Sequence, residues 1–246
     1  MAALWAIFYR ELIRYFREKV RIITSVVQPA IWLFVMGGGM SAAFTGPDGV
    51  NYRTFIFPGI VGMTVLFSAV FSSISIVWDR EFGFLKEVLV SPASRESIVL
   101  GKALGGATTS VIQGTIILIF APAVGINLTF SMVVKAFFTM YFIALTMAAL
   151  GIVIAARMQS MQGFQFISNF IVMPLFFLSG AIYPLKGVPN WLSALASIDP
   201  LAYGIDLLKH VFLPYHEYSL ITDVLVMTVF LIMFLFLGII LFKKDG

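Results

Sequence analysis

The residues of this chain that could do chemistry are few, and their spacing does not form an active site. The chain has only two histidines, His210 and His216, and their spacing matches no metal-binding motif of the His-Glu-x-x-His kind. Gly101-Lys102 superficially resembles the end of a phosphate-binding loop, but Glu96 stands where that motif needs glycine. There is no cysteine for a thiolate site or a disulfide, and no nucleophile and base can be paired. We therefore predict that the chain has no catalytic, cofactor-binding or metal site, and we interpret each histidine as an interfacial polar residue.

Long apolar stretches separate these polar residues. They run over 22–44, 54–78, 103–125, 132–156, 164–183 and 219–242. Each reaches the ~20 residues that a helix needs to cross a bilayer, and in lipid such stretches can only be helices. The sequence therefore predicts an all-α polytopic membrane protein with six transmembrane helices. The stretch 164–183 is the weakest of them, because Pro174 interrupts it.

The spans lack ionisable residues in their middles, where Gln28, Gln113, Gln165 and Asn169 are the strongest polar groups. Isolated amides of this kind most often join helices. Carriers coupled to protons or ions generally need ionisable groups inside the membrane, so this pattern argues against a secondary transporter. The chain also shows no energy source of its own.

Composition and charge indicate one membrane domain over 1–246 with a fixed orientation. Only 11% of the residues are charged, against about 25% in soluble domains, which leaves little room for a separate soluble domain. The net charge of +4 reflects orientation rather than nucleic-acid binding, because the basic residues lie beside span ends. Every Lys and Arg except Arg53, Lys135, Lys186 and Lys209 falls on the side of the two termini. The positive-inside rule then places both termini in the cytoplasm and the chain in the cell (inner or cytoplasmic) membrane.

The first polar segment, 1–21, carries an arginine stripe. Arg10, Arg14, Arg17 and Arg21 are spaced i, i+4, i+7 and i+11, opposite an aromatic-rich apolar face. This pattern predicts an amphipathic helix along the cytoplasmic membrane surface. It is interpreted as an orientation anchor on anionic lipid, and its exposed end is free to touch a cytoplasmic partner as well.

The longest cytoplasmic connection is 79–102. It mixes both charges with a compact apolar group and contains Pro92. We predict a short helix over 80–90, a break at Ser91-Pro92 and a new helix that starts near Ser94. A plain connector could be much shorter, so this segment is expected to dock on another molecule.

Small residues in the second and third spans predict close helix contacts. Ser68, Ser72 and Ser75 recur on one face of the second span, and Gly101 and Gly105 form a Gly-x-x-x-Gly pair. Both patterns favour close helix packing. The alternative for the serines is a polar strip that faces a substrate path.

The segment 184–218 on the outer side is broken by prolines yet stays apolar. It predicts two short helices that re-enter the outer leaflet. Irregular backbone at that depth must be packed in protein or line a cavity, so the segment is an outer gate or a static plug.

Two groups of motifs resemble the membrane (permease) subunits of type 2 ABC exporters of the drug, polysaccharide or lipid-linked glycan export kind. The first group is Phe57-Pro58-Gly59, then Arg80-Glu81-x-Gly83-x-Leu85-Lys86-x-x-Leu89-x-Ser91-Pro92, then Gly101-Lys102. The second is Leu178-Ser179-Gly180-Ala181-x-x-Pro184-Leu185-x-x-x-Pro189-x-Trp191, then Asp199-Pro200-Leu201-x-Tyr203-x-x-Asp206.

This resemblance implies that the 79–102 segment couples the chain to a separate nucleotide-binding ATPase, which binds the ATP and Mg²⁺. It also implies a homodimer in the lipid membrane. The residues that match the coupling motif are Arg80, Glu81, Gly83, Lys86, Glu87 and Pro92. The outer gate candidates are Gly180, which precedes the outer segment, and Pro184, Pro189, Trp191 and Pro200 within it.

The function expected on these grounds is a permease subunit of an ATP-driven exporter, not itself an enzyme. Its apolar bundle suits an amphipathic, drug-like or lipid-linked substrate. The alternatives are a passive channel or carrier that is not coupled to ATP, and a membrane anchor that transports nothing.

Overall fold

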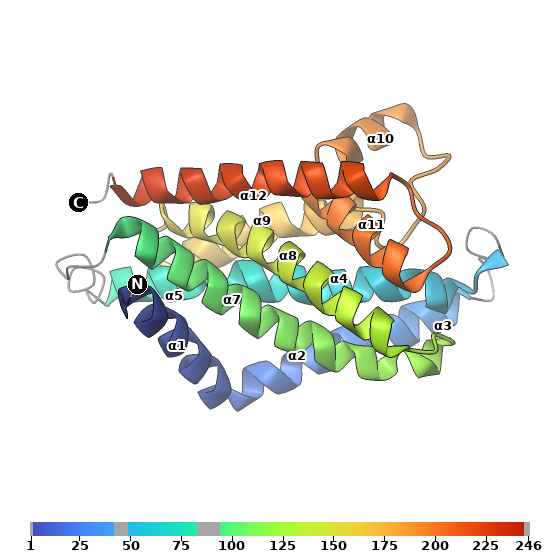
Figure 1. The fold of residues 1–246 in the computed structure, drawn as a ribbon, viewed down its shortest axis with the longest axis horizontal. Coiled ribbons are helices and arrows are strands. Elements are labelled where there is room, and N and C mark those ends of the chain that lie inside the picture. The colour runs from blue at the N-terminus through green and yellow to red at the C-terminus, as the bar shows by residue number, and fades with distance from the viewer. Residues whose placement is uncertain (1, 42–48, 83–93, 244–246) are drawn as a thin grey trace.

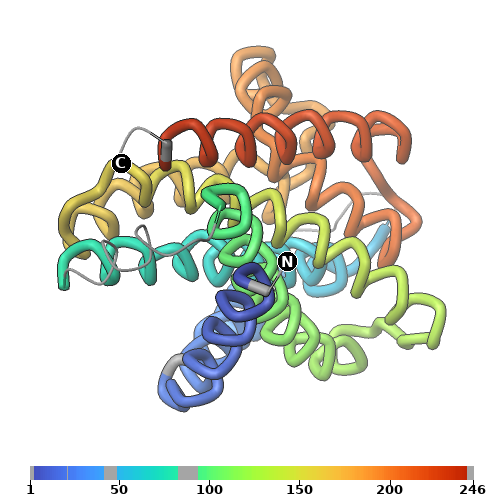
Figure 2. Tube along the Cα trace, turned by 60° about the vertical axis from the view of Figure 1, so that its left-hand side comes forward, coloured from blue at the N-terminus to red at the C-terminus, as the bar shows by residue number. Residues whose placement is uncertain are grey.

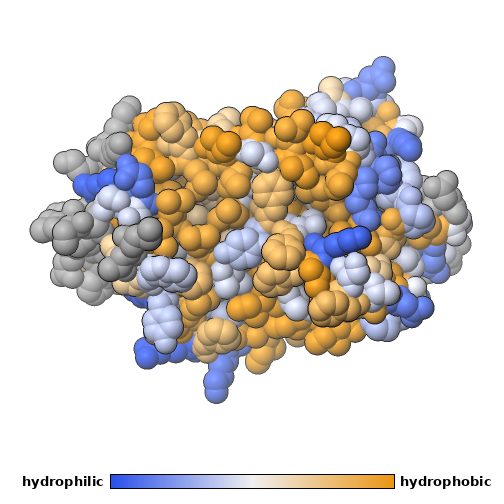
Figure 3. All heavy atoms as spheres, viewed as in Figure 1, coloured by the Kyte–Doolittle hydropathy of each residue, from blue (hydrophilic) through white to orange (hydrophobic). Residues whose placement is uncertain are grey.

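A computed structural model describes residues 2–41, 49–82 and 94–243 of the chain. Six helical segments in it are long and apolar enough to cross a membrane, which confirms the predicted all-α fold with six spans. They are Ile22–Met40, Tyr52–Glu81, Arg95–Phe120, Phe130–Ala155, Met161–Leu178 and Leu220–Phe242. Apolar side chains cover the middle of the face shown in Figure 3, and polar ones gather toward its two ends.

The centre of the bundle is α4 (Tyr52–Ser72), which α5 (Ile74–Glu81) continues after a break at Ser73. It lies against α7 (Arg95–Ile117) and α8 (Phe130–Ala155), as Figure 1 shows. Within the 18-residue apolar stretch of each span, 78% of the α4–α5 residues are buried, against 11% in the last span, which is formed by α12 (Leu220–Lys243). Glycines permit this close packing: a Cβ added at Gly151 of α8 would lie 2.6 Å from the carbonyl oxygen of Val70.

The chain begins with α1 (Ala2–Arg17) and turns at Glu18, whose φ of −90° and ψ of 68° are not helical. The first span follows as α2 (Lys19–Ile31), a π-helical turn at Trp32–Met36 and α3 (Gly37–Met40). The prediction of one arginine stripe from Arg10 to Arg21 was therefore wrong at its end. Because α1 stops at Arg17, Arg21 belongs to the next helix.

The Gly-x-x-x-Gly pair forms the surface on which α1 lies. A Cβ at Gly101 would be 3.0 Å from Ile7 Cβ, and one at Gly105 would be 2.8 Å from Glu11 Cβ. The predicted close packing at these glycines is confirmed, and their partner is α1. In Figure 2 the blue α1 lies beside the green α7 and projects from the bundle.

The spanning helix α9 (Met161–Leu178) leads to the other end of the bundle, away from both termini, where the chain forms α10 (Asn190–Ser197) and α11 (Pro200–Phe212). The predicted pair of short helices in 184–218 is present as α10 and α11. Asp199 caps α11 by accepting from Leu201 N at 2.8 Å, and Pro200 occupies its first position, where a missing N–H costs nothing. Almost the whole of α11 is buried against α4, α8 and α12.

Candidate functional site

A buried ionic cluster joins α1, α5 and α7 near the end of the bundle that carries both termini. Lys102 Nζ lies 3.1 Å from Glu11 Oε1 and 3.1 Å from Asp79 Oδ2, and donates to Ser75 Oγ at 2.9 Å. The side chains of Lys102, Asp79 and Glu11 are 4%, 7% and 9% exposed. Arg10 adds a second cation, with Nη2 at 2.6 Å from Asp79 Oδ2.

This cluster makes the three helices depend on one another. The ammonium of Lys102 has three N–H donors and three acceptors within reach. Removing one partner from such a desolvated pair leaves a buried charge uncompensated, which is costly. The cluster therefore holds α1, the end of α5 and the start of α7 in one arrangement. In the sequence, α5 and α7 lie on either side of residues 83–93.

Arg80 joins the same end of α5 to the turn between α8 and α9. Its guanidinium donates to three main-chain carbonyl oxygens at 2.6–3.2 Å, those of Ala155, Ala156 and Met158. These carbonyls lie at the C-terminal end of α8, where helical partners run out and a cation is favourable. A planar group with a fixed fork of donors can satisfy several carbonyls at once, which a lysine cannot.

Glu81 contacts the far end of that turn, where α9 begins. Its Oε2 accepts from the backbone N–H of Met161, the first residue of α9, at 3.1 Å. Free N–H groups and the positive end of the helix dipole favour a carboxylate there. Arg80 and Glu81 thus cap the end of one spanning helix and the start of the next.

The structure describes two of the six residues that match the coupling motif. Arg80 and Glu81 are placed as above, whereas Gly83, Lys86, Glu87 and Pro92 lie outside the described residues, as does the predicted 80–90 helix beyond Phe82. The predicted helix start near Ser94 is confirmed, because Ser94 Oγ accepts from Ser97 N at 3.2 Å and α7 begins at Arg95.

Sequence reasoning missed the cluster of Glu11, Asp79 and Lys102. The available signal was Lys102 directly after the first glycine of the Gly-x-x-x-Gly pair, since a lysine on a close-packed helix face must find an acid. Of the predicted serine contacts, Ser68 is confirmed as a link between helices, because it accepts from Ser110 Oγ of α7 at 2.9 Å.

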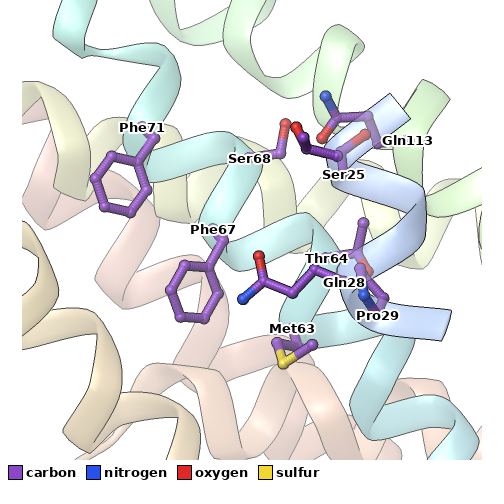
Figure 4. A pocket seen from close by; sticks show the side chains of 10 residues that line it. Ser25, Gln28, Pro29, Met63, Thr64, Phe67, Ser68, Phe71 and Gln113 are labelled. Carbon is purple, nitrogen blue, oxygen red and sulfur yellow. The ribbon is translucent and has the colours of Figure 1, made fainter. Parts of the chain in front are cut away.

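A cavity of about 270 Å³ opens between α2, α4 and α7. Its lining consists of Thr24, Ser25, Gln28, Pro29, Met63, Thr64, Phe67, Ser68, Phe71 and Gln113. Figure 4 shows the rings of Phe67 and Phe71 on one side, and the polar groups of Ser25, Ser68 and Gln113 gathered on another. Such a lining offers an apolar wall and a few hydrogen-bonding groups, as small-molecule sites commonly do. Ser68 therefore takes part both in helix packing and in the cavity.

The gate candidates occupy the connections around α10. Gly180 adopts φ +70° in the turn after α9, a conformation that favours glycine. Pro189 stands at the N-cap of α10, Pro200 starts α11, and Trp191 on α10 is 65% exposed. Pro184 lies in the connection between α9 and α10 and is partly buried.

Two of the quoted motifs meet in space at this end. A Cβ added at Gly59 of α4 would lie 2.8 Å from Ala181 Cα, so the Phe57-Pro58-Gly59 turn of α4 touches the Gly180-Ala181 turn directly. The central helix therefore contacts the turn after α9 near one end and carries Asp79, Arg80 and Glu81 beyond the other.

Comparison with known proteins places these features in a family. Residues 2–213 match the ABC-2 type transporter family. The chain belongs to this family. It is 30% identical to the putative transport permease ycf38 of Cyanophora paradoxa, with 98% of this chain and 88% of that protein covered. It is 29% identical to nodulation protein J of Rhizobium leguminosarum bv. viciae, with 76% and 73% covered. It is 32% identical to the probable multidrug ABC transporter permease YbhR of Escherichia coli, with 67% of this chain and 45% of that protein covered.

The ABC-2 match includes the ionic cluster, Arg80 and Glu81, and both motif groups. As a member of this family the chain is a membrane transport subunit rather than an enzyme, and the family's nucleotide-binding ATPase is a separate partner.

Proposed function

We propose that this ABC-2 permease is the transmembrane subunit of an ATP-driven exporter that moves an amphipathic, drug-like or lipid-linked substrate outward. Two copies would assemble in the cell membrane with a separate ATPase that binds ATP and Mg²⁺, and both termini would face the cytoplasm. The arginine-bearing α1 would lie along the membrane surface, and α10 and α11 would re-enter the outer leaflet. The basic residues on the side of the termini support this orientation.

The observation that carries the proposal is the set of bonds around the 79–102 segment. Asp79 is tied to α1 and α7 through Arg10 and Lys102, and Arg80 and Glu81 are tied to the turn between α8 and α9. A force on this segment would therefore reach several spanning helices together. For ATP to drive a change, the segment must bind one state of the ATPase better than the other.

The substrate class is inferred from the cavity between α2, α4 and α7. Two phenyl rings face hydroxyl and amide groups there, and no Asp, Glu, Lys, Arg or His is in the lining of this cavity. An uncharged or amphipathic molecule matches this surface better than a small ion. Figure 4 shows that the polar groups come from three helices, so a shift of one helix changes the cavity.

The test is reconstitution of the full-length chain with its ATPase in liposomes. ATP-dependent movement of a fluorescent amphipathic substrate is expected, and Arg80→Ala should lower it by about 10- to 100-fold, the equivalent of one charge-assisted hydrogen bond of roughly 1.5–3 kcal/mol. Arg80→Lys keeps the charge but loses the fork, so it should also impair transport. Arg157→Ala is the matched control, because it removes an exposed arginine from the neighbouring turn.

The other outcomes decide between the alternatives. Flux without nucleotide would favour a passive channel or carrier. Stable assembly with an ATPase that no substrate stimulates would favour an anchoring role. If Arg80→Ala and Glu81→Ala leave ATP-driven transport unchanged, the proposed coupling site is wrong.

A further inference from the structure

The corner between α11 and α12 brings together side chains that the sequence keeps apart. Asp206, His210 and His216 each offer one ligand atom, and these atoms all lie within 4.8 Å of one another. The two imidazole rings are stacked, with centroids 4.0 Å apart and planes 22° apart. His210 Nε2 and His216 Nδ1 lie 3.2 Å and 2.9 Å from the same carbonyl oxygen, that of Tyr218, so they converge on one place.

The backbone explains how this convergence arises. Asp206 and His210 are four residues apart on α11 and so share a face of that helix. His216 is brought back by the loop after α11, which Asp206 holds by accepting from Glu217 N at 2.7 Å and Tyr218 N at 2.8 Å. A carboxylate has about four lone-pair sites, so Asp206 keeps acceptor capacity after these two bonds.

A second observation points to the same place. The side chain of Asp223, in the first turn of α12, is 0% exposed, and its Oδ2 lies 3.4 Å from His210 Nε2. Neither of its carboxylate oxygens has a hydrogen-bond partner among the described residues. A buried carboxylate without donors is costly unless something compensates its charge.

Negatively charged side chains outnumber positively charged ones in this corner, an imbalance that a bound cation would reduce. Three buried acids, Asp206, Glu217 and Asp223, share this corner with one buried lysine, Lys209. Lys209 Nζ is 3.9 Å from Glu217 Oε1 and has no hydrogen-bond partner of its own among the described residues. The carboxyl groups outnumber the single ammonium group, so a divalent cation would be electrostatically favoured in this corner.

We propose that Asp206, His210, His216 and Asp223 bind one divalent transition metal ion, with Zn²⁺ as the favoured ion. Two imidazoles with carboxylates are a typical zinc donor set, whereas Ca²⁺ and Mg²⁺ take oxygen ligands. Four protein ligands would close the site, as in structural rather than catalytic zinc centres. The metal would join the end of α11, the loop and the start of α12 at the end of the bundle away from the termini.

Metal binding would require one tautomer of each imidazole. A neutral imidazole has a lone pair for a metal. In the metal-free chain His210 Nε2 and His216 Nδ1 donate to Tyr218 O, so a metal ion would replace both hydrogen bonds and the protons would then sit on His210 Nδ1 and His216 Nε2. His216 is exposed, which gives an ion a path from solvent.

The test uses the full-length chain in detergent, purified without a polyhistidine tag and stripped with a chelator. Titration with ZnCl₂ should give one ion per chain, and a 100-fold excess over Kd should raise Tm by about 5–10 °C. Co²⁺ should bind at the same stoichiometry and give visible d–d bands typical of nitrogen and oxygen ligands.

Variants assign the site. His216→Gln, at an exposed position, should weaken Zn²⁺ binding at least ~10-fold without lowering the Tm of the metal-free protein, and His210→Gln should weaken it similarly. Asp199→Asn is the matched control, because it changes another buried acid of the outer segment and should leave Zn²⁺ affinity unchanged. This test does not depend on transport.

Three results would overturn the proposal. The first is no saturable Zn²⁺ or Co²⁺ binding. The second is Zn²⁺ binding that neither histidine variant weakens. The third is a metal-free Asp199→Asn protein, which lacks the other raised carboxyl, whose Tm still rises between pH 7.5 and pH 5.5 while Zn²⁺ has no effect on the parent chain; the corner would then be a proton site instead.

Discussion

Replacing Lys102 by methionine tests the ionic cluster that ties α1 to the second and third spans. Methionine keeps most of the side-chain volume and helix propensity but removes the charge and all three donors. The change leaves Asp79 paired with Arg10 at 2.6 Å. Among the described residues Glu11 then keeps Ser75 Oγ at 3.2 Å and Arg10 Nη2 at 4.0 Å, and its side chain is just 9% exposed, so water replaces little of the lost contact.

The geometry sets the expected magnitude. Removal of one partner from a buried ion pair costs about 3–5 kcal/mol. Arg10 still compensates the charge of Asp79 after the change, although the Arg10 side chain is 47% exposed. We therefore expect Lys102→Met to lower the free energy of unfolding by ~2–4 kcal/mol, somewhat less than the full cost. In a chain of this length each 1 kcal/mol shifts Tm by about 2–4 °C, so Tm should fall by roughly 5–15 °C.

The assay is a double-mutant cycle on the purified chain in detergent, followed by thermal unfolding. Glu11→Gln removes the charge that Lys102→Met leaves unpaired, so the double variant should be more stable than the sum of the single losses by about 1–3 kcal/mol. Lys19→Met is the control, because Lys19 is exposed at the start of α2 and should change Tm little.

Additive losses in this cycle would refute the interpretation, because they would mean that Lys102 and Glu11 do not interact. A Lys102→Met variant within about 0.5 kcal/mol of the parent would do the same, since it would show that water solvates the cluster.

Two further changes test the outer end. Gly59→Ala puts a methyl group against the main chain of Ala181, which cannot rotate away, so thermal unfolding should show a loss of about 2–3 kcal/mol in the free energy of unfolding. Gly39→Ala is the control, because its methyl group enters open space and should be neutral or stabilising. Equal effects of the two changes would show that α4 and the turn after α9 do not touch. Burial raises the pKa of Asp199 from 3.8 to about 8, so the folded state keeps a proton that the unfolded chain has lost. The free energy of unfolding should therefore fall as pH rises from about 4 to 8, and Asp199→Asn, which keeps the cap, should make Tm less dependent on pH across that window; an unchanged pH dependence would contradict the shift.

The fold was largely predictable because lipid leaves so few choices. A long apolar stretch in a membrane must be a helix, so hydropathy alone predicted all six spans. Local capping chemistry predicted the start of α7 at Ser94. The end of α1 was not predictable in this way. No proline or glycine stands near Glu18, and the break there accompanies the contact of α1 with Gly101 and Gly105.

The candidate site was predicted only in part, and the reason is the kind of partner each residue has. The family motif indicated Arg80 and Glu81, but their partners are backbone carbonyl and N–H groups, which every residue has and no sequence pattern reveals. Lys102 and Glu11 are 91 residues apart, so their pairing follows only from the docking of α1 on α7. His210 and His216 were dismissed as a metal pair on spacing, yet a loop that Asp206 holds brings them together.

One helix connects the two ends that these residues define. In its first half, α4 touches Ala181 of the turn after α9 at Gly59, and Ile205 of α11, in the outer segment, at Gly62. Past Ser73 it continues as α5, which presents Asp79, Arg80 and Glu81 to the other helices. Well-packed interfaces of this kind do not deform gradually, so a displacement of α5 must move α4 as a unit or bend it at Ser73. We expect the first result if the outer segment is a gate that ATP controls, and the second if it is a static plug.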